Sequence, residues 1–455
     1  MPTVGPDRAL CVTGVLLLAA SLLSACADGP DPVGAAPPAA TGAASSIDPS
    51  IVEGIPIPPD LVRAFSDLLD RRSAAVLTGD RASFLADVDA RPDGFVATQE
   101  GYFDNLTQLP FVEFRYDLDR ASLVRGGSGG YWVVVALTQQ LAGFDAAPVR
   151  TLDRFRFSPV PNPAGESEQY ALSSVTDREW ERTHAVLEQP WDERPIEVRT
   201  GAGVLGVFDA GSVRRARPLI RSIERGISDV SVRVPYSWPQ NVVVYALSDV
   251  TFLDRLDDLP GDDAETLDAV AFTVPTGSVV NGRDEIAATR IVLNPRVLTS
   301  ESAARDRLVR HELTHVAVGE RDDVAPLWLG EGLAEWVSVQ ALAPQDRQVS
   351  DAALRSVERG VPSMPGNEEF NDDDYEVHYA LAWWTCEYLA ATYGPEAPWL
   401  LLDALATPEA DVRQVVNDLL QLNVDQLARR GAKLMITTYD PGFLQPAPAT
   451  PTQSP

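Results

Sequence analysis

The pentapeptide His311-Glu312-Leu313-Thr314-His315 constrains the fold of this 455-residue chain more than any other feature. The surrounding pattern of apolar residues predicts a helix over residues 302–318. One stripe of that helix, of the kind that normally faces a core, contains five residues: Ala304, Leu308, His311, His315 and Val318. Two inward-facing imidazoles one turn apart can reach one zinc ion, and Glu312 faces the same cavity.

A second motif lies in the apolar run over residues 327–336, which carries two carboxylates one helical turn apart. An ionised carboxylate is costly to bury in such a run unless it is paired or binds a metal. Glu331 is therefore the natural third ligand. Glu335 is a candidate partner for the second ring nitrogen of a ligating histidine, which would fix that ring. The alternative for Glu335 is a surface carboxylate.

Taken together, the two motifs resemble the gluzincin metallopeptidases of the MA clan, the superfamily of thermolysin and the aminopeptidase N-type enzymes. In that family the second helix carries the third ligand in an Asn-Glu-Gly or similar setting, here Gly330-Glu331-Gly332, with Gly330 in place of the usual Asn. The resemblance covers roughly residues 290–394. It implies that His311, His315 and Glu331 bind zinc and that the connection over residues 319–326 is tight.

The resemblance also implies a hydrolytic mechanism. Zinc held by three protein ligands keeps a position for water and lowers its pKa toward about 7, and Glu312 acts as the general base that passes the proton to the leaving amine. A hydrogen-bond donor must face the negative charge that develops opposite the metal. Tyr375-Glu376 resembles the Tyr-Glu step of aminopeptidase N-type enzymes; His378 and Tyr379 are rival donors, and a packed aromatic is the alternative. A closed structural zinc site is the alternative for the whole centre.

Residues 288–293 predict a strand just before the first motif. In gluzincins the strand at this place forms the edge along which an extended peptide lies. The resemblance implies that residues 289–293 supply backbone donors and acceptors to a peptide substrate. An internal strand with no open edge is the alternative.

The charge of the chain limits its partners. It contains 37 basic and 66 acidic residues, which give a net charge of −29. Nucleic acid and anionic membrane surfaces both require positive patches, so both are poor partners. The acidity otherwise agrees with a soluble secreted protein, and the sequence predicts no oligomeric state.

The amino-terminal segment predicts export. An apolar stretch over residues 10–23 is too short to span a bilayer comfortably and ends in Leu23-Ser24-Ala25-Cys26. This resembles the lipobox of bacterial lipoproteins, which implies a signal peptide over residues 1–26, lipid on Cys26 and an extracytoplasmic location at the cell membrane. An ordinary cleaved signal with a coincidental cysteine is the alternative. In the folded part only Cys386 remains, and we expect it to be a buried, inert thiol.

The remaining sequence predicts an α+β protein with two folded domains. Residues 27–55 and 441–455 have the composition of a disordered tether and tail. Residues 56–180 predict a small α+β domain, with helices over 59–89 and antiparallel strands near 111–116, 131–138, 151–157 and 170–175. This domain resembles the cone-shaped fold of nuclear-transport-factor-like proteins, with Gly126–Gly130 as a hairpin loop. Residues 181–440 predict a mostly helical metallopeptidase-like domain. We expect His184 to be structural or exposed.

The main hypothesis is therefore a lipid-anchored zinc peptidase that acts on peptide or protein substrates. One alternative is a cell-envelope binding lipoprotein that keeps the fold but has little turnover. Another is a zinc hydrolase of non-peptide amides.

Overall fold

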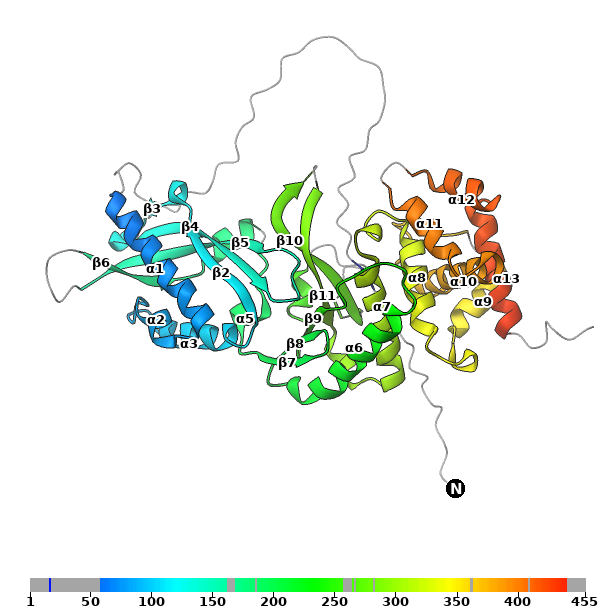
Figure 1. Cartoon of the computed structure of the whole chain (residues 1–455), viewed down its shortest axis with the longest axis horizontal. Helices are drawn as coiled ribbons and strands as arrows, with labels where there is room; N and C mark the ends of the chain where they lie inside the picture. The colour runs from blue at the N-terminus through cyan, green and yellow to red at the C-terminus, as the bar shows by residue number, and fades with distance from the viewer. Residues whose placement is uncertain are drawn as a thin grey trace, which may run out of the picture. The chain divides into compact units, whose positions relative to one another are not determined.

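Figure 1 shows the computed structural model of the chain. It describes residues 58–161, 168–184, 186–256, 264–265, 267–280, 283–360, 363–407 and 410–439, together with the two-residue strand β1 (Leu16–Leu17). Apart from β1, the predicted signal peptide with Cys26, the tether and the tail lie outside the described residues. The described chain combines helices with two sheets, which confirms the α+β class. No helix within it has both the length and the apolar character needed to cross a membrane.

The chain divides into two compact units. The N-terminal unit comprises the described residues from Pro58 to Pro195 together with Pro275–Ala287. The C-terminal unit comprises β1, Ile196–Val274 and the described residues from Ala288 onward. The first unit extends past residue 180 because the Asn105 side chain donates hydrogen bonds to the carbonyls of Trp191 and Arg194.

In the N-terminal unit, one helix packs against an antiparallel sheet and two shorter helices follow it (Figure 1). The helices are α1 (Pro59–Thr78), α2 (Arg81–Leu85) and α3 (Phe95–Leu106). The strands have the order β2-β4-β5-β6: β2 (Phe111–Leu118), β4 (Tyr131–Leu141), β5 (Val149–Val160) and β6 (Gln169–Ser174). The short strand β3 (Val124–Arg125) pairs with β4 across the predicted hairpin loop, and the short helices α4 (Arg178–Thr183) and α5 (Pro190–Glu193) follow β6. Phe65 of α1 stacks on Phe157 of β5 with ring centroids 4.2 Å apart, so α1 is anchored on the sheet.

The C-terminal unit begins with a mixed sheet. Its strands have the order β1-β10-β11-β9-β8-β7. Their bounds are β7 (Glu197–Gly201), β8 (Val204–Phe208), β9 (Val242–Ala246), β10 (Ala269–Val280) and β11 (Arg283–Leu293). Strands β8 and β9 are parallel and buried at every residue, as expected for strands covered on both faces. Helix α6 (Ala216–Ser231) connects them and packs against α7.

The prediction that residues 289–293 form an open sheet edge is wrong. Strand β11 pairs in parallel with β9, with Arg290 opposite Val243, and has β10 on its other side. The long outer strand is β10, and among the described strands only β1 pairs beyond it, opposite Val270 and Ala271. The local sequence of β11 could not reveal this order, because a strand becomes internal through its partners.

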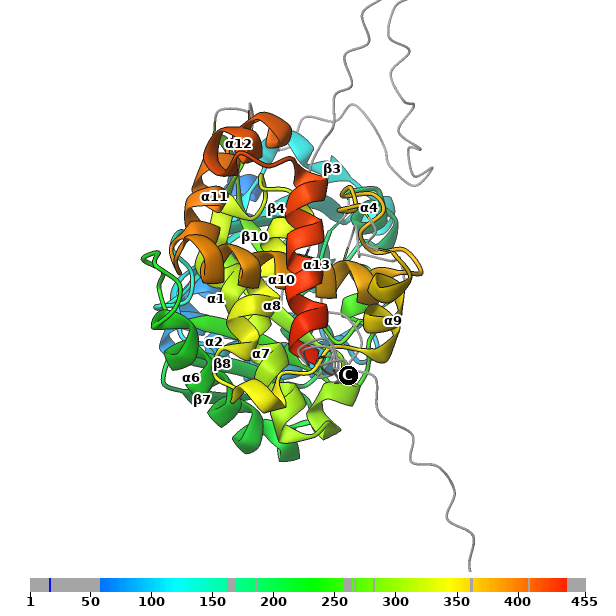
Figure 2. The ribbon, with the colours of Figure 1, turned by 90° about the vertical axis from the view of Figure 1, so that its right-hand side faces the viewer.

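The rest of the C-terminal unit is helical (Figure 2). The helices are α7 (Ser302–Val318), α8 (Leu327–Val339), α9 (Asp351–Arg359), α10 (Tyr375–Tyr393), α11 (Ala397–Leu405), α12 (Val412–Leu420) and α13 (Val424–Tyr439). Helix α10 is central, because it packs against α8, α9, α11 and α13. Figure 2 shows α13 crossing in front of α10.

Two glycines let neighbouring helices approach the backbone of α10. A Cβ atom at Gly332 of α8 would lie 2.6 Å from the carbonyl oxygen of Ala382, and one at Gly431 of α13 would lie 2.7 Å from the backbone nitrogen of Thr385. Neither distance leaves room for a methyl group. Cys386 lies at the Gly332 contact and is fully buried, and burial raises the pKa of its thiol, which agrees with the predicted inert cysteine.

Candidate metal centre

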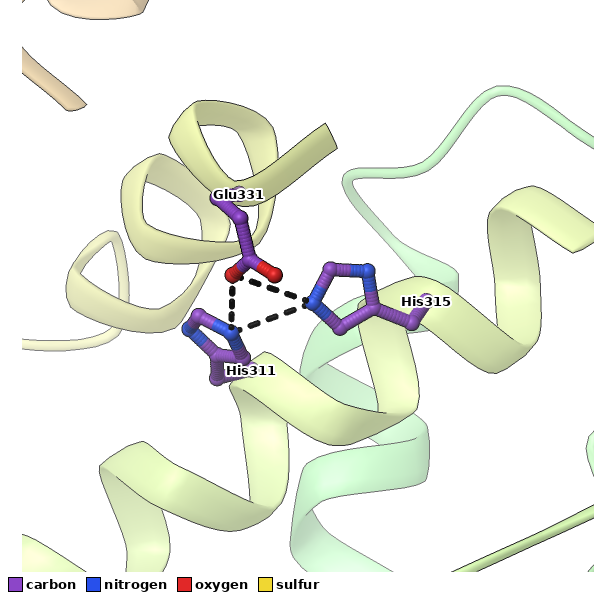
Figure 3. Close-up of side chains that lie close together, drawn as sticks. All are labelled: His311, His315 and Glu331. Atoms are coloured by element: carbon purple, nitrogen blue, oxygen red, sulfur yellow. Dashed lines mark hydrogen bonds and ion pairs between the residues drawn. The ribbon is translucent and has the colours of Figure 1, made fainter. Parts of the chain in front are cut away.

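Three side chains converge between α7 and α8 (Figure 3). His311 and His315 project from successive turns of α7, and Glu331 projects from α8. The Nε2 atoms of the histidines are 3.1 Å apart, and Glu331 Oε2 lies 3.1 Å from His311 Nε2 and 3.7 Å from His315 Nε2. One ligand atom from each residue lies within 4.8 Å of the other two. This buried group could hold a metal ion.

The surroundings of the group favour a cation. His311, His315 and Glu331 are 1%, 3% and 0% exposed, so bulk water does not reach them. The two facing Nε2 atoms have room for one shared proton at most. Glu331 Oε1 is buried, and within the described residues it has no hydrogen bond of good geometry. Two imidazole nitrogens and a carboxylate are common ligands of transition metals, and a bound cation would satisfy all three.

Each histidine also contacts a carboxylate through its other ring nitrogen. His311 Nδ1 lies 3.0 Å from Glu335 Oε1, as predicted for Glu335, and the same carboxylate pairs with Arg307. His315 Nδ1 lies 2.8 Å from Asp322 Oδ2. Such contacts orient ligating imidazoles. The sequence prediction missed Asp322; the only available signal was an acidic residue in the short connection between the two motifs.

These carboxylates determine the charge of the metal-free site. Burial lowers the pKa of His311, but Glu331 and Glu335 outweigh it and raise the pKa to about 9. Burial likewise lowers the pKa of His315, but Asp322 and Glu331 raise it to about 10. Burial opposes ionisation of Glu331, yet the two histidines keep its pKa below its usual range. Without metal, the carboxylates therefore favour protonated imidazoles at neutral pH, with one proton shared between the two Nε2 atoms.

Glu312 lies beside the ligands and is not a member of the group. It is 0% exposed, and neither carboxylate oxygen has a hydrogen bond of good geometry within the described residues. Burial raises the pKa of Glu312 to about 7 against the opposing effect of the two histidines. The backbone N–H of Ala271 in β10 lies close enough to lower that pKa slightly. A carboxyl group with this pKa can accept and release a proton near neutral pH.

The structure separates the three candidate donors of α10. Tyr379 is 7% exposed, and its pKa is raised well above the usual range by burial and then by Glu331, Glu335 and Glu312. Its hydroxyl also lies 3.5 Å from Asn371 Oδ1. His378 instead directs Nδ1 at the carbonyl of Phe370, 3.0 Å away. Tyr375 is only partly buried, one turn before Tyr379. The tyrosine that the structure brings to the metal group is therefore Tyr379.

The fourth histidine of the chain lies in the N-terminal unit. His184 is exposed and stacks on Trp180 with ring centroids 4.0 Å apart, and its Nδ1 lies 2.7 Å from the Trp180 carbonyl. This agrees with the predicted structural or exposed role.

The identification of this candidate metal centre depends on the structural observations alone. Neither the models of known protein families nor the curated proteins contain a significant match to this chain.

Proposed function

We propose that the chain is a zinc-dependent peptidase. The observation that carries the proposal is the convergence of His311, His315 and Glu331 beside Glu312, a buried carboxyl group with a pKa near neutrality. In the described part of the chain three ligands converge rather than four, which suits a catalytic zinc site more than a structural one. Bound zinc would polarise a peptide carbonyl and lower the pKa of a water molecule.

Two side chains would do the remaining chemistry. Glu312 would take a proton from the attacking water and release it to the leaving amine, for which its pKa of about 7 is well matched. Tyr379 would donate its hydroxyl proton in a hydrogen bond to the developing oxyanion. We assign this role to Tyr379 rather than to Tyr375 or His378 because the carboxylates of the metal group act directly on its pKa.

A peptide substrate would lie along β10 rather than β11. Strand β10 is the long outer strand, and Ala271 within it lies next to Glu312. The pairing of β1 with Val270 and Ala271 indicates that the outer edge of β10 can accept another extended segment. Main-chain hydrogen bonds to this edge would place a peptide carbonyl beside the metal group.

A purified chain that begins at residue 27 tests the proposal. It should contain one zinc per chain and should cleave members of a broad peptide library, and a chelator should abolish the cleavage. Absence of zinc from protein prepared with zinc supplied would remove the proposal.

The lipid anchor at Cys26 is a separate proposal, supported by the Leu23-Ser24-Ala25-Cys26 sequence, and membrane fractionation of a Cys26→Ser variant tests it.

Zinc affinity should increase as the pH rises from 6 toward 9. Zinc must displace the proton shared by His311 Nε2 and His315 Nε2, and the pKa values of the two imidazoles are raised to about 9 and about 10. Those raised values also stabilise the metal-free fold; the contribution is complete below the unfolded value of about 6.5 and is lost as the pH rises through 9 to 10. Competition with a chromophoric chelator at several pH values measures the trend. A dissociation constant independent of pH would show that the histidines are neutral before zinc binds.

The second candidate is a binding lipoprotein of the cell envelope with little turnover. The burial of Glu312 and of all three ligands favours it, because a peptide must reach the centre for hydrolysis to occur. The same peptide library separates the two functions, since a binding protein would show no cleavage that depends on Glu312.

A further inference from the structure

The connection between the two motif helices brings a carboxylate to the metal group. Asp322 Oδ2 accepts a hydrogen bond from His315 Nδ1 at 2.8 Å, and the Asp322 side chain is 8% exposed. When Nδ1 donates, the lone pair of Nε2 is free for a metal. Glu335 lies at 3.0 Å from His311 Nδ1 but outside good hydrogen-bond geometry. Of the two outer carboxylates, Asp322 therefore makes the better-formed contact.

The carboxylate of Asp322 occupies the space above Gly330. A Cβ atom at Gly330 would overlap Asp322 Oδ1 and would lie 3.4 Å from its Cγ. Gly330 is inside α8 and does not have a positive φ, so its backbone conformation does not require glycine. Helix propensity alone favours alanine at such a position. The absence of a side chain at Gly330 is explained by Asp322.

The residue before Asp322 is held at two points. The Arg321 guanidinium lies 4.0 Å from the centre of the Tyr236 ring, and Arg321 Nε donates to Asp403 at 3.0 Å. The Tyr236 hydroxyl donates to the same carboxylate at 3.0 Å. These contacts attach the connection to Tyr236 and Asp403 next to Asp322.

We propose that Asp322 is a positioning residue for His315 and that Gly330 is required because it leaves room for Asp322. The proposal rests on the metal-binding function proposed above. It states that alanine at position 330 weakens metal binding by displacing Asp322, not by altering α8. Asp322 and Gly330 then act as one unit.

A double-mutant cycle tests this coupling. Zinc dissociation constants are measured by chelator competition for the unmodified chain, Asp322→Ala, Gly330→Ala and the double variant. Each single substitution should weaken zinc binding by about 10- to 100-fold, and the double variant should be no weaker than either single one. The visible absorption spectrum of the cobalt-loaded protein should change in the same way in all three variants, because it reports the geometry at the metal.

Two matched controls accompany the cycle. Gly101→Ala replaces a helical glycine with nothing within 4 Å of the added Cβ, and Glu320→Gln removes an exposed charge from the same connection. Both should bind zinc like the unmodified chain. Asp322→Asn keeps the size of the side chain and an acceptor oxygen, so it should recover part of the affinity lost in Asp322→Ala. If Gly330→Ala does not fold, the comparison of Asp322→Asn with Asp322→Ala still tests whether Asp322 positions His315.

The outcomes separate this inference from the proposed function. Additive losses in the double variant, or an unchanged dissociation constant in Asp322→Ala, would overturn the role of Asp322 while the unmodified chain still binds zinc. Failure of the unmodified chain to bind zinc would instead overturn the metal function itself.

Discussion

Glu312→Gln is expected to reduce peptide hydrolysis by about 10²- to 10⁴-fold and to leave zinc bound. Glutamine has nearly the same shape as glutamate but cannot accept the proton of the attacking water. The three ligands that converge on the metal position do not include Glu312, so the substitution leaves them intact. Steady-state hydrolysis of the best library peptide and metal analysis of the same preparation provide the two measurements.

The stability of this variant provides an independent check. Glu312 is fully buried and has no well-formed hydrogen bond within the described residues, so glutamine loses no partner there. We expect Glu312→Gln to unfold at the same or a higher urea concentration than the unmodified chain. Glu320→Gln, at an exposed position close in sequence, is the matched control and should retain activity. Undiminished hydrolysis by Glu312→Gln would exclude Glu312 as the base.

Gly332→Ala is expected to lower the free energy of unfolding by about 1–3 kcal/mol, the range typical of an overpacked core. The added methyl group would meet the carbonyl group of Ala382 and the sulfur of Cys386. The Ala382 carbonyl carbon and oxygen are backbone atoms of α10, which cannot rotate away as a side chain can. Urea denaturation monitored by circular dichroism measures the loss of stability. This loss should exceed the gain from the higher helix propensity of alanine.

Two further glycines test whether contact with α10 is the cause. Gly431→Ala should also destabilise, because its Cβ would meet the backbone at Thr385. Gly366→Ala lies in the same unit with open space around the added atom and should be nearly neutral. If all three variants were equally stable, α10 would have to move without cost, and contact with α10 would not be the cause of destabilisation. Peptide hydrolysis by Gly332→Ala should fall by more than the loss of folded protein explains, since α10 also carries Tyr379.

Local pattern was sufficient for the parts of the site built from single helices. The helix predicted over residues 302–318 has the observed bounds Ser302–Val318, because its apolar stripe and both histidines face the interior together. The position of Glu331 in the buried group was predictable for a related reason, since a carboxylate in a run as apolar as α8 needs a cation or a partner. The strands predicted in the N-terminal unit also appear, since each is rich in aromatic and β-branched residues and lies between turns.

The errors concern relations between distant segments. β10 became the outer strand through its pairing, which a strand's own sequence does not contain. Tyr375 and Tyr379 lie one turn apart on the same helix, and the position of α10 against α8 and α13 decided which of them reaches Glu331. Asp322 is one of several acidic residues near the motif, and only the folded connection shows that it meets His315.

The contact of Gly431 with α10 connects helix α13 to the proposed site. Tyr379 lies on a helix supported from one neighbour by α8 and from another by α13, a segment that contributes no ligand itself. A nascent chain that has not yet produced α13 would already possess His311, His315 and Glu331 but would lack the support that seats Tyr379. Under the proposed function, such a chain would contain the metal-binding residues before Tyr379 is held in place.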